Sequence, residues 1–299
     1  MLAVTILGNN SALPAFDRHP TSQVVTLNEH LFLVDCGEGT QMQIAKYRIK
    51  RSRIHHIFIS HLHGDHYFGL MGLITSMGLL GRDHELHIFA PPALEQLIDL
   101  QLKAGGTLLP YSLIFHPLEE GILMQEDKFE VSCFKVFHRI DCWGFIFREK
   151  KPPRKLDGEK IKEYNIPTSF YEQLRWGKDY TTTDGVSISN ELLTDVSPKG
   201  KSYAYAADTI YNESIACKVT GVDLLYHETT YLDELRERAA KRFHSTTVEA
   251  ANIANIAKVN KLLIGHFSSK YEKLDEFERE TRNVFPNTDL AIEGVTYRI

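Results

Sequence analysis

The segment HLHGDH, residues 61–66, places three histidines and one aspartate within six consecutive positions. It follows an apolar run that is typical of a buried strand. Residues two apart at a strand end can point the same way, so His61 and His63 can bind one cation together. Asp65 and His66 fall where the next helix is expected to begin, and a helix N-terminus favours an anionic carboxylate and a neutral imidazole. The segment therefore predicts ligands for two neighbouring metal ions.

Further ligands are expected downstream, because four side chains cannot fill two ions of coordination number four or five. His138, Asp208 and His266 each come directly after an apolar stretch that predicts a strand. An α/β fold gathers its functional residues at such strand ends, and Asp208 is the natural carboxylate to bridge two ions. Several other histidines are scattered, and we expect these to be surface or structural residues: His19, His30, His55, His56, His84, His87 and His116.

The composition predicts a folded protein without a membrane span. Its 299 residues are 43% apolar and 24% charged, which is enough for a sizeable core. No run approaches the roughly 18 uninterrupted apolar residues that a membrane span needs, and the first residues lack the pattern of a signal peptide. The four cysteines lie far apart in the sequence and form no C-x-x-C pair, which argues against a disulfide framework. We therefore expect a cytoplasmic protein that is not bound to a membrane.

Positive charge is concentrated in parts of a chain whose formal net charge is −5. Residues 148–162 hold seven Lys or Arg and three acidic residues, and residues 46–53 hold five basic residues and no acid. Each run is either a solvated face or a phosphate-binding surface. Residues 148–180 are also polar, contain several Pro and Gly, and are poor in core-forming apolar residues. This pattern predicts a flexible arm inserted into a single domain that otherwise spans residues 1–299.

The rest of the chain alternates strands and helices. Apolar strands are expected over residues 31–37 and 54–60, and helices with an apolar period over residues 40–48 and 93–105. The alternation resumes after the predicted arm, with a helix expected over residues 246–259. Strands mixed with helices in both halves predict an α/β sandwich, in which outer helices cover two packed sheets.

These motifs resemble those of the metallo-β-lactamase superfamily and, within it, of the ribonuclease Z family. HLHGDH is the superfamily motif, and the resemblance covers nearly the whole chain. The other matching segments are ILGNNSALP (6–14), RHPTS (18–22), LVDCGEGTQMQ (33–43), Phe137-His138-Arg139, Asp208-Thr209, Leu225–Thr230, Phe243–Thr246 and Gly265–Tyr271. The superfamily motif alone leaves the substrate open, so these segments and the predicted arm narrow the resemblance to ribonuclease Z.

The resemblance implies the metallo-β-lactamase fold, a four-layer αβ/βα sandwich of two mixed sheets with outer helices and a projecting arm. It also implies two Zn²⁺ ions per subunit, with Mn²⁺ as an alternative that the same N/O ligands accept, and usually a homodimer. The implied activity is endonucleolytic removal of the 3′ trailer from precursor tRNA near the discriminator base, which leaves a 3′-hydroxyl on the tRNA. The arm of one subunit would grip the tRNA elbow while the partner subunit cuts.

The resemblance also assigns roles to individual residues. One zinc would bind His61, His63 and His138, the other would bind Asp65, His66 and His266, and both would share Asp208. Asp65 would additionally accept the proton of the attacking water. His244 precedes a T-x-x-E capping box that fixes its backbone and is the candidate general acid, with a local structural histidine as the alternative. Glu228 would orient His244 or satisfy backbone groups, and Asp35 would hydrogen-bond a metal-ligating histidine or serve as a turn aspartate.

Basic residues would bind the RNA by contacting its phosphates, without distinguishing its bases. These residues are Lys150, Lys151, Arg154, Lys155, Lys160 and Lys199. The arm's aromatic residues would stack on bases or pack a small core of the arm, and packing is the favoured interpretation: Tyr164, Phe170, Tyr171 and Trp176. The chain departs from the family at Thr168-Ser169, where members commonly carry Gly-Pro, and in a shortened loop at residues 198–200.

Two other functions remain open on this sequence. A metal-dependent hydrolase of small phosphodiesters would use the same ligands, and a catalytically silent member would only bind RNA. The complete ligand set argues against a silent protein. The basic arm argues against a small substrate, which needs no such segment.

Overall fold

The computed structural model describes all residues, 1–299, and divides into two compact units. The larger unit comprises Met1–Arg148 and Lys201–Ile299, and the smaller unit comprises Glu149–Gly200. The predicted arm, residues 148–180, overlaps the smaller unit, which continues to Gly200. It continues because a later strand, β14 (Thr194–Asp195), pairs with β11 (Lys155–Leu156) near the start of the unit.

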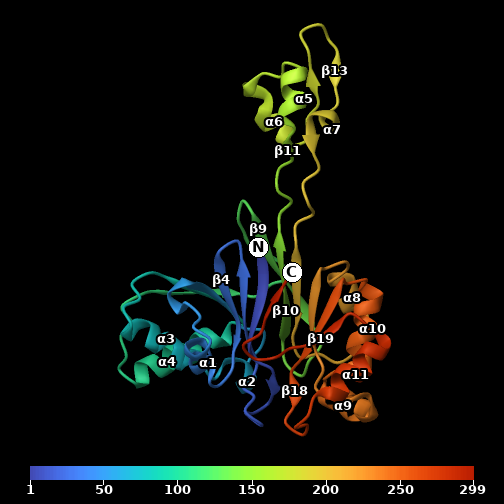
Figure 1. Cartoon of the computed structure of the whole chain (residues 1–299). Coiled ribbons are helices and arrows are strands. Elements are labelled where there is room, and N and C mark those ends of the chain that lie inside the picture. The colour runs from blue at the N-terminus through green and yellow to red at the C-terminus, as the bar shows by residue number, and fades with distance from the viewer. The chain divides into compact units, whose positions relative to one another are not determined.

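The larger unit contains two seven-stranded sheets (Figure 1). The first has the order β20 (Thr296–Arg298), β1 (Leu2–Gly8), β3 (Ser22–Leu27), β4 (His30–Cys36), β5 (Ile54–Phe58), β6 (Leu86–Ala90) and β7 (Leu113–Pro117). The second has the order β19 (Thr288–Leu290), β17 (Lys261–Gly265), β16 (Leu224–Glu228), β15 (Ser202–Ala206), β10 (Cys142–Glu149), β9 (Phe129–Val136) and β8 (Gly121–Gln125). A separate pair joins β2 (Asn10–Ser11) to β18 (Phe267–Ser268). Both large sheets are mixed. In the first, β4 to β7 run parallel whereas β1 and β3 are antiparallel, and in the second, β15, β16, β17 and β19 run parallel whereas β10 and β15 are antiparallel.

Helices cover the outer face of each sheet (Figure 1). The first sheet carries α1 (Thr40–Lys46), α3 (Leu70–Leu79) and α4 (Ala93–Ala104), and the second carries α8 (Ser214–Lys218), α10 (Thr247–Ala257) and α11 (Asp275–Val284). Ile57 of β5 joins Leu73 of α3 and Leu94 of α4 in one buried cluster. The predicted α/β sandwich is confirmed, with its layers in the order helices, sheet, sheet, helices. None of the helices combines the length and apolar character needed to cross a membrane.

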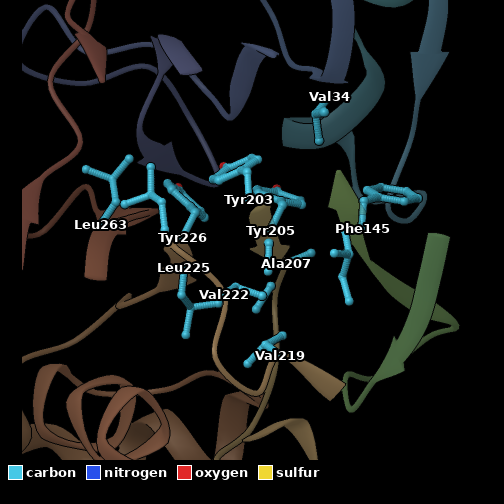
Figure 2. Packing of buried hydrophobic residues seen from close by; sticks show 14 of the residues in the cluster. Val34, Phe145, Tyr203, Tyr205, Ala207, Val219, Val222, Leu225, Tyr226 and Leu263 are labelled. Carbon is cyan, nitrogen blue, oxygen red and sulfur yellow. The ribbon is translucent and has the colours of Figure 1, made fainter. Parts of the chain in front are cut away.

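The core between the sheets is rich in aromatic side chains (Figure 2). Tyr203 and Tyr205 of β15 lie beside Tyr226 of β16, and the rings of Tyr205 and Tyr226 stack with centroids 5.1 Å apart. All residues of β15 and β16 are buried, as expected for parallel strands covered on both faces. This packing holds the ends of the central strands in a rigid arrangement.

The start of α10 shows how sequence determines a local boundary. The Thr246 side chain caps the helix by accepting from the backbone N–H of Glu249, while Glu249 Oε2 accepts from the Thr246 N–H at 2.9 Å. The predicted capping box is therefore confirmed, and it fixes the backbone immediately after His244.

The smaller unit has its own apolar core, formed by Ile161, Ile166, Leu174, Ile188 and Leu193. Its elements are β11 (Lys155–Leu156), α5 (Gly158–Glu163), α6 (Tyr171–Arg175), β12 (Tyr180–Thr181), β13 (Ser187–Ile188), α7 (Asn190–Leu193) and β14 (Thr194–Asp195). Three of the four predicted aromatic residues pack against this core: Tyr164, Phe170 and Tyr171. Trp176 is instead 66% exposed, and its indole N–H donates to Glu172 at 2.8 Å.

Candidate metal centre

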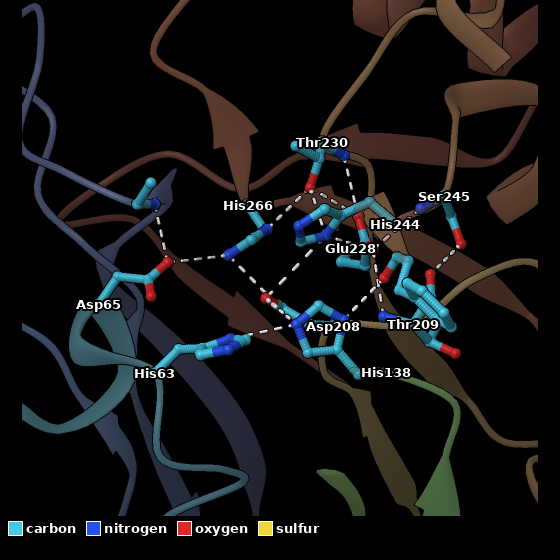
Figure 3. Close-up of polar contacts among 12 residues, drawn as sticks. His63, Asp65, His138, Asp208, Thr209, Glu228, Thr230, His244, Ser245 and His266 are labelled. Atoms are coloured by element: carbon cyan, nitrogen blue, oxygen red, sulfur yellow. Dashed lines mark hydrogen bonds and ion pairs between the residues drawn. The ribbon is translucent and has the colours of Figure 1, made fainter. Parts of the chain in front are cut away.

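Every predicted metal ligand lies just beyond the carboxyl end of a strand in the larger unit. The loop after β5 and the short helix α2 (Gly64–Tyr67) carry His61, His63, Asp65 and His66. The segments after β9, β15 and β17 carry His138, Asp208 and His266. The fold brings all seven side chains together, although they span more than 200 positions of the sequence. Figure 3 labels His63, Asp65, His138, Asp208 and His266 among them.

One group joins His61, His63, His138 and Asp208, whose ligand atoms all lie within 4.8 Å of one another. His63 Nδ1 is 3.0 Å from His61 Nε2 and 3.1 Å from His138 Nε2. Asp208 Oδ2 is 3.7 Å from His61 Nε2 and 3.9 Å from His138 Nε2. Three imidazole nitrogens and a carboxylate oxygen that converge in this way form a donor set typical of a tetrahedral divalent-metal site.

A second group joins Asp65, His66, Asp208 and His266 within the same limit of 4.8 Å. His266 Nε2 is 3.3 Å from His66 Nε2 and 3.4 Å from Asp65 Oδ2. Asp208 Oδ1 is 3.4 Å from His66 Nε2 and 3.2 Å from His266 Nε2. This group therefore offers two imidazole nitrogens and two carboxylates.

Asp208 belongs to both groups and turns one carboxylate oxygen toward each (Figure 3). The residue is buried, and its Oδ1 has no hydrogen-bond partner. A buried carboxylate oxygen without a partner is costly, and a divalent cation between this oxygen and the nearby imidazoles would satisfy it. The residues present therefore fit divalent cations held on either side of a shared aspartate.

Asp35 orients one of the predicted ligands, His66, by bonding the ring nitrogen that faces away from the second group. Its Oδ2 accepts hydrogen bonds from His66 Nδ1 at 2.8 Å and from Tyr205 Oη at 2.6 Å. Ser60 donates twice to the same carboxylate, from its N–H to Oδ1 at 2.7 Å and from its hydroxyl to Oδ2 at 2.8 Å. Because His66 donates its Nδ1 proton to Asp35, its Nε2 lone pair faces the second group. Of the two roles expected for Asp35, the structure contains the hydrogen bond to a candidate ligand.

Two other candidate ligands are anchored through the ring nitrogen that faces away from the centre. His138 Nδ1 donates to the carbonyl oxygen of Phe243 at 2.8 Å, so its Nε2 carries the lone pair that faces Asp208. His266 Nδ1 lies 2.9 Å from the hydroxyl of Thr230. Anchors of this kind fix ring orientation and tautomer before a cation binds.

His244 and Glu228 form a buried pair beside the two groups. His244 Nδ1 donates to Glu228 Oε1 at 3.0 Å, and the same oxygen accepts from the backbone N–H of Ser245 at 2.9 Å. Glu228 Oε2 accepts from the N–H and the hydroxyl of Thr230. Glu228 therefore has both predicted roles, since it orients His244 and satisfies backbone groups. Burial opposes protonation of His244, but Glu228 outweighs it and raises the pKa of the imidazole.

Most pKa shifts at the centre suit a cation, but His66 differs: burial lowers its pKa, and Asp208 with the other nearby carboxylates outweighs burial and raises the pKa of this imidazole well above its ordinary value. Burial, together with His138, lowers the pKa of His63 to about 4, and burial also lowers the pKa of His61 and of His138. Burial alone would raise the pKa of Asp208, but nearby imidazoles, His266 first among them, hold it well below its usual range. Neutral imidazoles and ionised carboxylates are the forms that bind metal.

Four non-glycine residues around the centre have a left-handed backbone conformation. Ala12, Asp35, Phe243 and His266 all have left-handed φ values, between 54° and 66°, where non-glycine residues are uncommon. The backbone N–H of Ala12 donates to Asp65 Oδ2 at 2.7 Å. At each of these positions the unusual conformation directs a side chain or a backbone group at a candidate site residue, which is where such strain is typically retained.

Comparison with known sequences identifies the family. Residues 2–151 match the family model of the anti-Pycsar protein Apyc1. Ribonuclease Z of Bacteroides fragilis is 44% identical to this chain over 293 residues, which cover 97% of this chain and 96% of that protein. Ribonuclease Z of Bacteroides thetaiotaomicron is 43% identical over 297 residues, covering 98% and 94%. The chain belongs to the ribonuclease Z family.

Solved structures agree on the fold. The short form of human tRNase Z superposes with a TM-score of 0.72 at 24% identity, and the alignment covers 99% of each chain. The metallo-β-lactamase fold protein YhfI from Bacillus subtilis gives a TM-score of 0.71 at 18% identity over the full length of both chains. The metallo-β-lactamase fold expected from HLHGDH is therefore confirmed for this ribonuclease Z family member.

The predicted RNA-binding residues of this family member lie in the smaller unit and differ in their surroundings. Lys151, Lys155 and Lys199 are exposed. Lys160 pairs with Glu163 at 2.9 Å. Arg154 donates to the hydroxyl of Thr194 at 2.6 Å and to its carbonyl at 3.2 Å, which ties β11 to β14. Lys150 is half-buried.

The histidines expected to be structural lie away from the centre. On the first sheet, His56, His87 and His116 stack in a row, with His87 Nδ1 2.9 Å from His116 Nε2. His56 and His87 also line a cavity of about 560 Å³, together with His55 and His84. His19 Nδ1 lies 3.0 Å from Glu293 Oε2.

Sequence reasoning missed three contributors to the site of this ribonuclease Z relative. Ser60 directly precedes HLHGDH, and Thr230 closes the matched segment Leu225–Thr230, so proximity to a motif was a usable signal for both. Tyr205 had no such signal. It donates to Asp35 across 170 positions of sequence, and only the packing of the two sheets brings them together.

Proposed function

We propose that this chain is a metal-dependent endoribonuclease that removes the 3′ trailer of precursor tRNA and leaves a 3′-hydroxyl on the tRNA. The observation that carries the proposal is Asp208, whose two carboxylate oxygens each face a separate cluster of imidazoles. Full-length similarity to ribonuclease Z proteins supports the substrate. The short form of human tRNase Z shares the fold.

The proposed cofactor is a pair of Zn²⁺ ions, with Mn²⁺ as an alternative for the same ligands. One ion would be held by His61, His63, His138 and Asp208, and the other by Asp65, His66, His266 and Asp208. When bound, the pair supplies Lewis acidity toward the phosphate and acidifies water. The residues around the centre then hold these ligands at fixed orientations.

Asp65 is the proposed proton acceptor for the attacking water. Its Oδ2 is held by the Ala12 N–H and faces His266. Burial alone would raise the pKa of Asp65, but the neighbouring His66 and the hydrogen bond to His266 lower it, which keeps the carboxylate ionised. An oriented, ionised carboxylate within the ligand cluster can accept a proton during attack.

His244 is the proposed general acid for the leaving group, the O3′ atom of the tRNA. Glu228 holds the Nδ1–H of His244, so in the imidazolium form the Nε2–H is the proton available for donation. The Glu228 carboxylate favours that charged form. An alkoxide leaving group requires such a proton, and a positioned acid typically contributes about 10²–10⁴-fold in rate.

The smaller unit is the proposed tRNA-binding arm. Lys150, Lys151, Lys155 and Lys160 would contact phosphates, and Lys199 would contact the RNA from the returning segment. Over residues 149–200 the basic and acidic residues are equal in number, so binding would depend on the basic cluster at 150–162 rather than on the charge of the whole unit. We also propose that this arm is flexible.

The proposed assembly is a homodimer that acts on precursor tRNA in the cytoplasm. In this arrangement the arm of one subunit would hold the tRNA that its partner cuts. All four cysteines are free, as expected in a reducing compartment. Light scattering of the purified protein would measure the mass, and a monomer at working concentration would contradict the proposed assembly.

The decisive experiment compares two substrates with the zinc-loaded protein: a precursor tRNA with a defined trailer, and bis-p-nitrophenyl phosphate. We expect a single cut after the discriminator base, a 3′-hydroxyl on the tRNA and a 5′-phosphate on the trailer. Cleavage of the small diester alone would instead support a small-molecule phosphodiesterase. Binding of the tRNA without cleavage of either substrate would support a catalytically silent RNA-binding protein.

A further inference from the structure

Phe243 has a conformation that its side chain makes unfavourable. It ends α9 (Arg236–Arg242) with φ 60° and ψ 46°, in the left-handed region. Helices commonly end in this way, but the residue there is usually glycine, because a bulky L-residue is strained in this conformation. The hydrogen bonds of the turn use only the backbone of Phe243, whose N–H donates to Ala240 and whose carbonyl accepts from His138. A glycine would keep all of them.

The ring of Phe243 lies at the surface and is only partly covered. It is not among the buried residues of the three hydrophobic clusters, and no other aromatic ring stacks on it. The side chain is 39% exposed. Burial in the hydrophobic core therefore does not offset the conformational cost. A bulky residue in a strained conformation that glycine would adopt more easily points to a functional use of its side chain.

A second exposed aromatic residue lies next to the same candidate site residues. Phe137, which directly precedes His138, is 44% exposed and is also absent from the hydrophobic clusters. The rings of His138 and His244 have centroids 5.1 Å apart, and the Phe243 carbonyl accepts from His138, so the backbone positions of Phe137 and Phe243 both adjoin the proposed general acid and the first ligand group. Exposed aromatic residues at this location have a suitable partner in a nucleobase, since every base has a face that can stack.

We propose that Phe243, bordered by Phe137, stacks on the base of the nucleotide that carries the leaving O3′ atom. The proposal rests on the proposed function, because His244 protonates that oxygen and Phe243 is its immediate neighbour in the chain. In the proposed arrangement the base attached to the same ribose would lie against the Phe243 ring. A stacking surface holds any of the four bases, so it positions the RNA without restricting its sequence.

The test is a double-mutant cycle that combines removal of the Phe243 ring with removal of the RNA base. Precursor tRNA is prepared with a normal nucleotide or an abasic one directly before the cut, and kcat/KM is measured for the wild type and for Phe243→Ala. Each single change should lower kcat/KM by about 5- to 150-fold, the range of base–aromatic stacking. The combination should cost no more than either change alone. Losses that multiply would show that the ring and the base do not interact, and would overturn the proposal.

Backbone effects are separated by a second pair of variants. Phe243→Gly and Phe243→Ala both remove the ring, but only the glycine relieves the left-handed strain. Both should lose stacking, whereas the glycine variant should have the higher Tm. Phe243→Tyr keeps an aromatic face and should retain wild-type kcat/KM. Leu108→Ala removes an exposed apolar side chain elsewhere in the larger unit and should leave kcat/KM unchanged on both RNA substrates. Loss in the tyrosine variant equal to that in the alanine variant would contradict stacking.

A binding readout distinguishes failure of this proposal from failure of the proposed function. A precursor tRNA with 2-aminopurine at the same nucleotide should lose fluorescence when it binds the wild type, because stacking quenches the base, and should lose less with Phe243→Ala. Equal quenching by both proteins overturns the stacking proposal, whether or not the RNA is cut. Absence of cleavage with normal, ring-dependent quenching would overturn only the proposed activity.

Discussion

The metal centre and the smaller unit hold their side chains in opposite ways. In the centre, Asp35, Asp208 and Glu228 are almost completely buried, and the carboxylates of Asp35 and Glu228 accept several hydrogen bonds each. In the smaller unit, the candidate RNA-binding lysines Lys151 and Lys155 are exposed. In the proposed mechanism, the buried groups of the centre act in chemistry that any phosphodiester undergoes. The exposed lysines of the smaller unit would affect only the binding of a polyanion. Substitutions in the two regions should therefore differ in which substrates they affect.

The largest effect is expected for Asp208→Asn, which removes the charge shared by both ligand groups. The variant should bind fewer than two metal ions per chain and lose about 10⁴-fold or more in kcat/KM, on precursor tRNA and on bis-p-nitrophenyl phosphate alike. Elemental analysis and both assays measure this. Asp223→Asn is the matched control, because Asp223 is equally an aspartate with little exposure, bonded to Ser202 outside the centre. Retention of both ions and of activity by Asp208→Asn would contradict the shared-ligand assignment.

A smaller and selective effect is expected for His244→Ala. Cleavage of precursor tRNA should fall by about 10²–10⁴-fold, because the ribose oxygen needs a proton to leave. The loss on bis-p-nitrophenyl phosphate should be much smaller, since p-nitrophenolate leaves without one. Metal content should match the wild type. His84→Ala, at an exposed histidine outside the centre, provides the comparison, and equal losses on both substrates would argue that His244 is structural.

Asp35→Asn should weaken metal binding rather than abolish it. The substitution removes the carboxylate that orients His66, and loss of such an outer partner typically costs about 10–100-fold in metal affinity. Competition with a chelator should show one ion weakened more than the other, because Asp35 bonds His66 of the second ligand group directly and reaches His61 of the first only through the Ser60 hydroxyl. Equal weakening of both ions would mean that Asp35 acts through the fold instead.

The lysines of the smaller unit should affect RNA alone. A variant with Lys150, Lys151, Lys155 and Lys160 changed to Gln should raise KM for precursor tRNA and reduce the salt dependence of binding, by about 0.9 in log–log slope for each phosphate that a lysine no longer neutralises. Hydrolysis of the small diester should stay at the wild-type rate. The corresponding Lys-to-Arg variant keeps the charges and should keep the slope. An unchanged slope in the Gln variant would exclude these lysines as phosphate-binding residues.

The smallest effect is expected for Arg154→Lys in the same unit. Arg154 bonds Thr194 through its guanidinium, so the variant should destabilise the β11–β14 pairing by about 1 kcal/mol. Hydrogen exchange of the amides in these two strands would detect the loosening. The salt slope should stay at its wild-type value, and a lower slope would instead make Arg154 an RNA-binding residue.

Much of the fold and of the candidate site was predictable because the signals are local. Apolar strands followed by His or Asp predicted the ligand positions, and Thr246 with Glu249 predicted the start of α10. The contacts that orient the ligands were not predictable in the same way. The Ala12 N–H and the Phe243 carbonyl are backbone groups, which no residue type reveals, and their roles depend on left-handed conformations at non-glycine residues.

The sequence by itself determined the donor set of the centre, since HLHGDH and three later strand-end residues supply the imidazoles and carboxylates that divalent cations prefer. Only the tertiary structure decided how the donors are divided, with Asp208 turning one oxygen to each group, and how they are held, with Tyr205 reaching Asp35 from the other sheet. The physical reason is the separation along the chain over which each kind of signal acts. Residue types and periodicity act within a few positions of the chain, whereas the distances between ligand atoms follow from the packing of two sheets against each other.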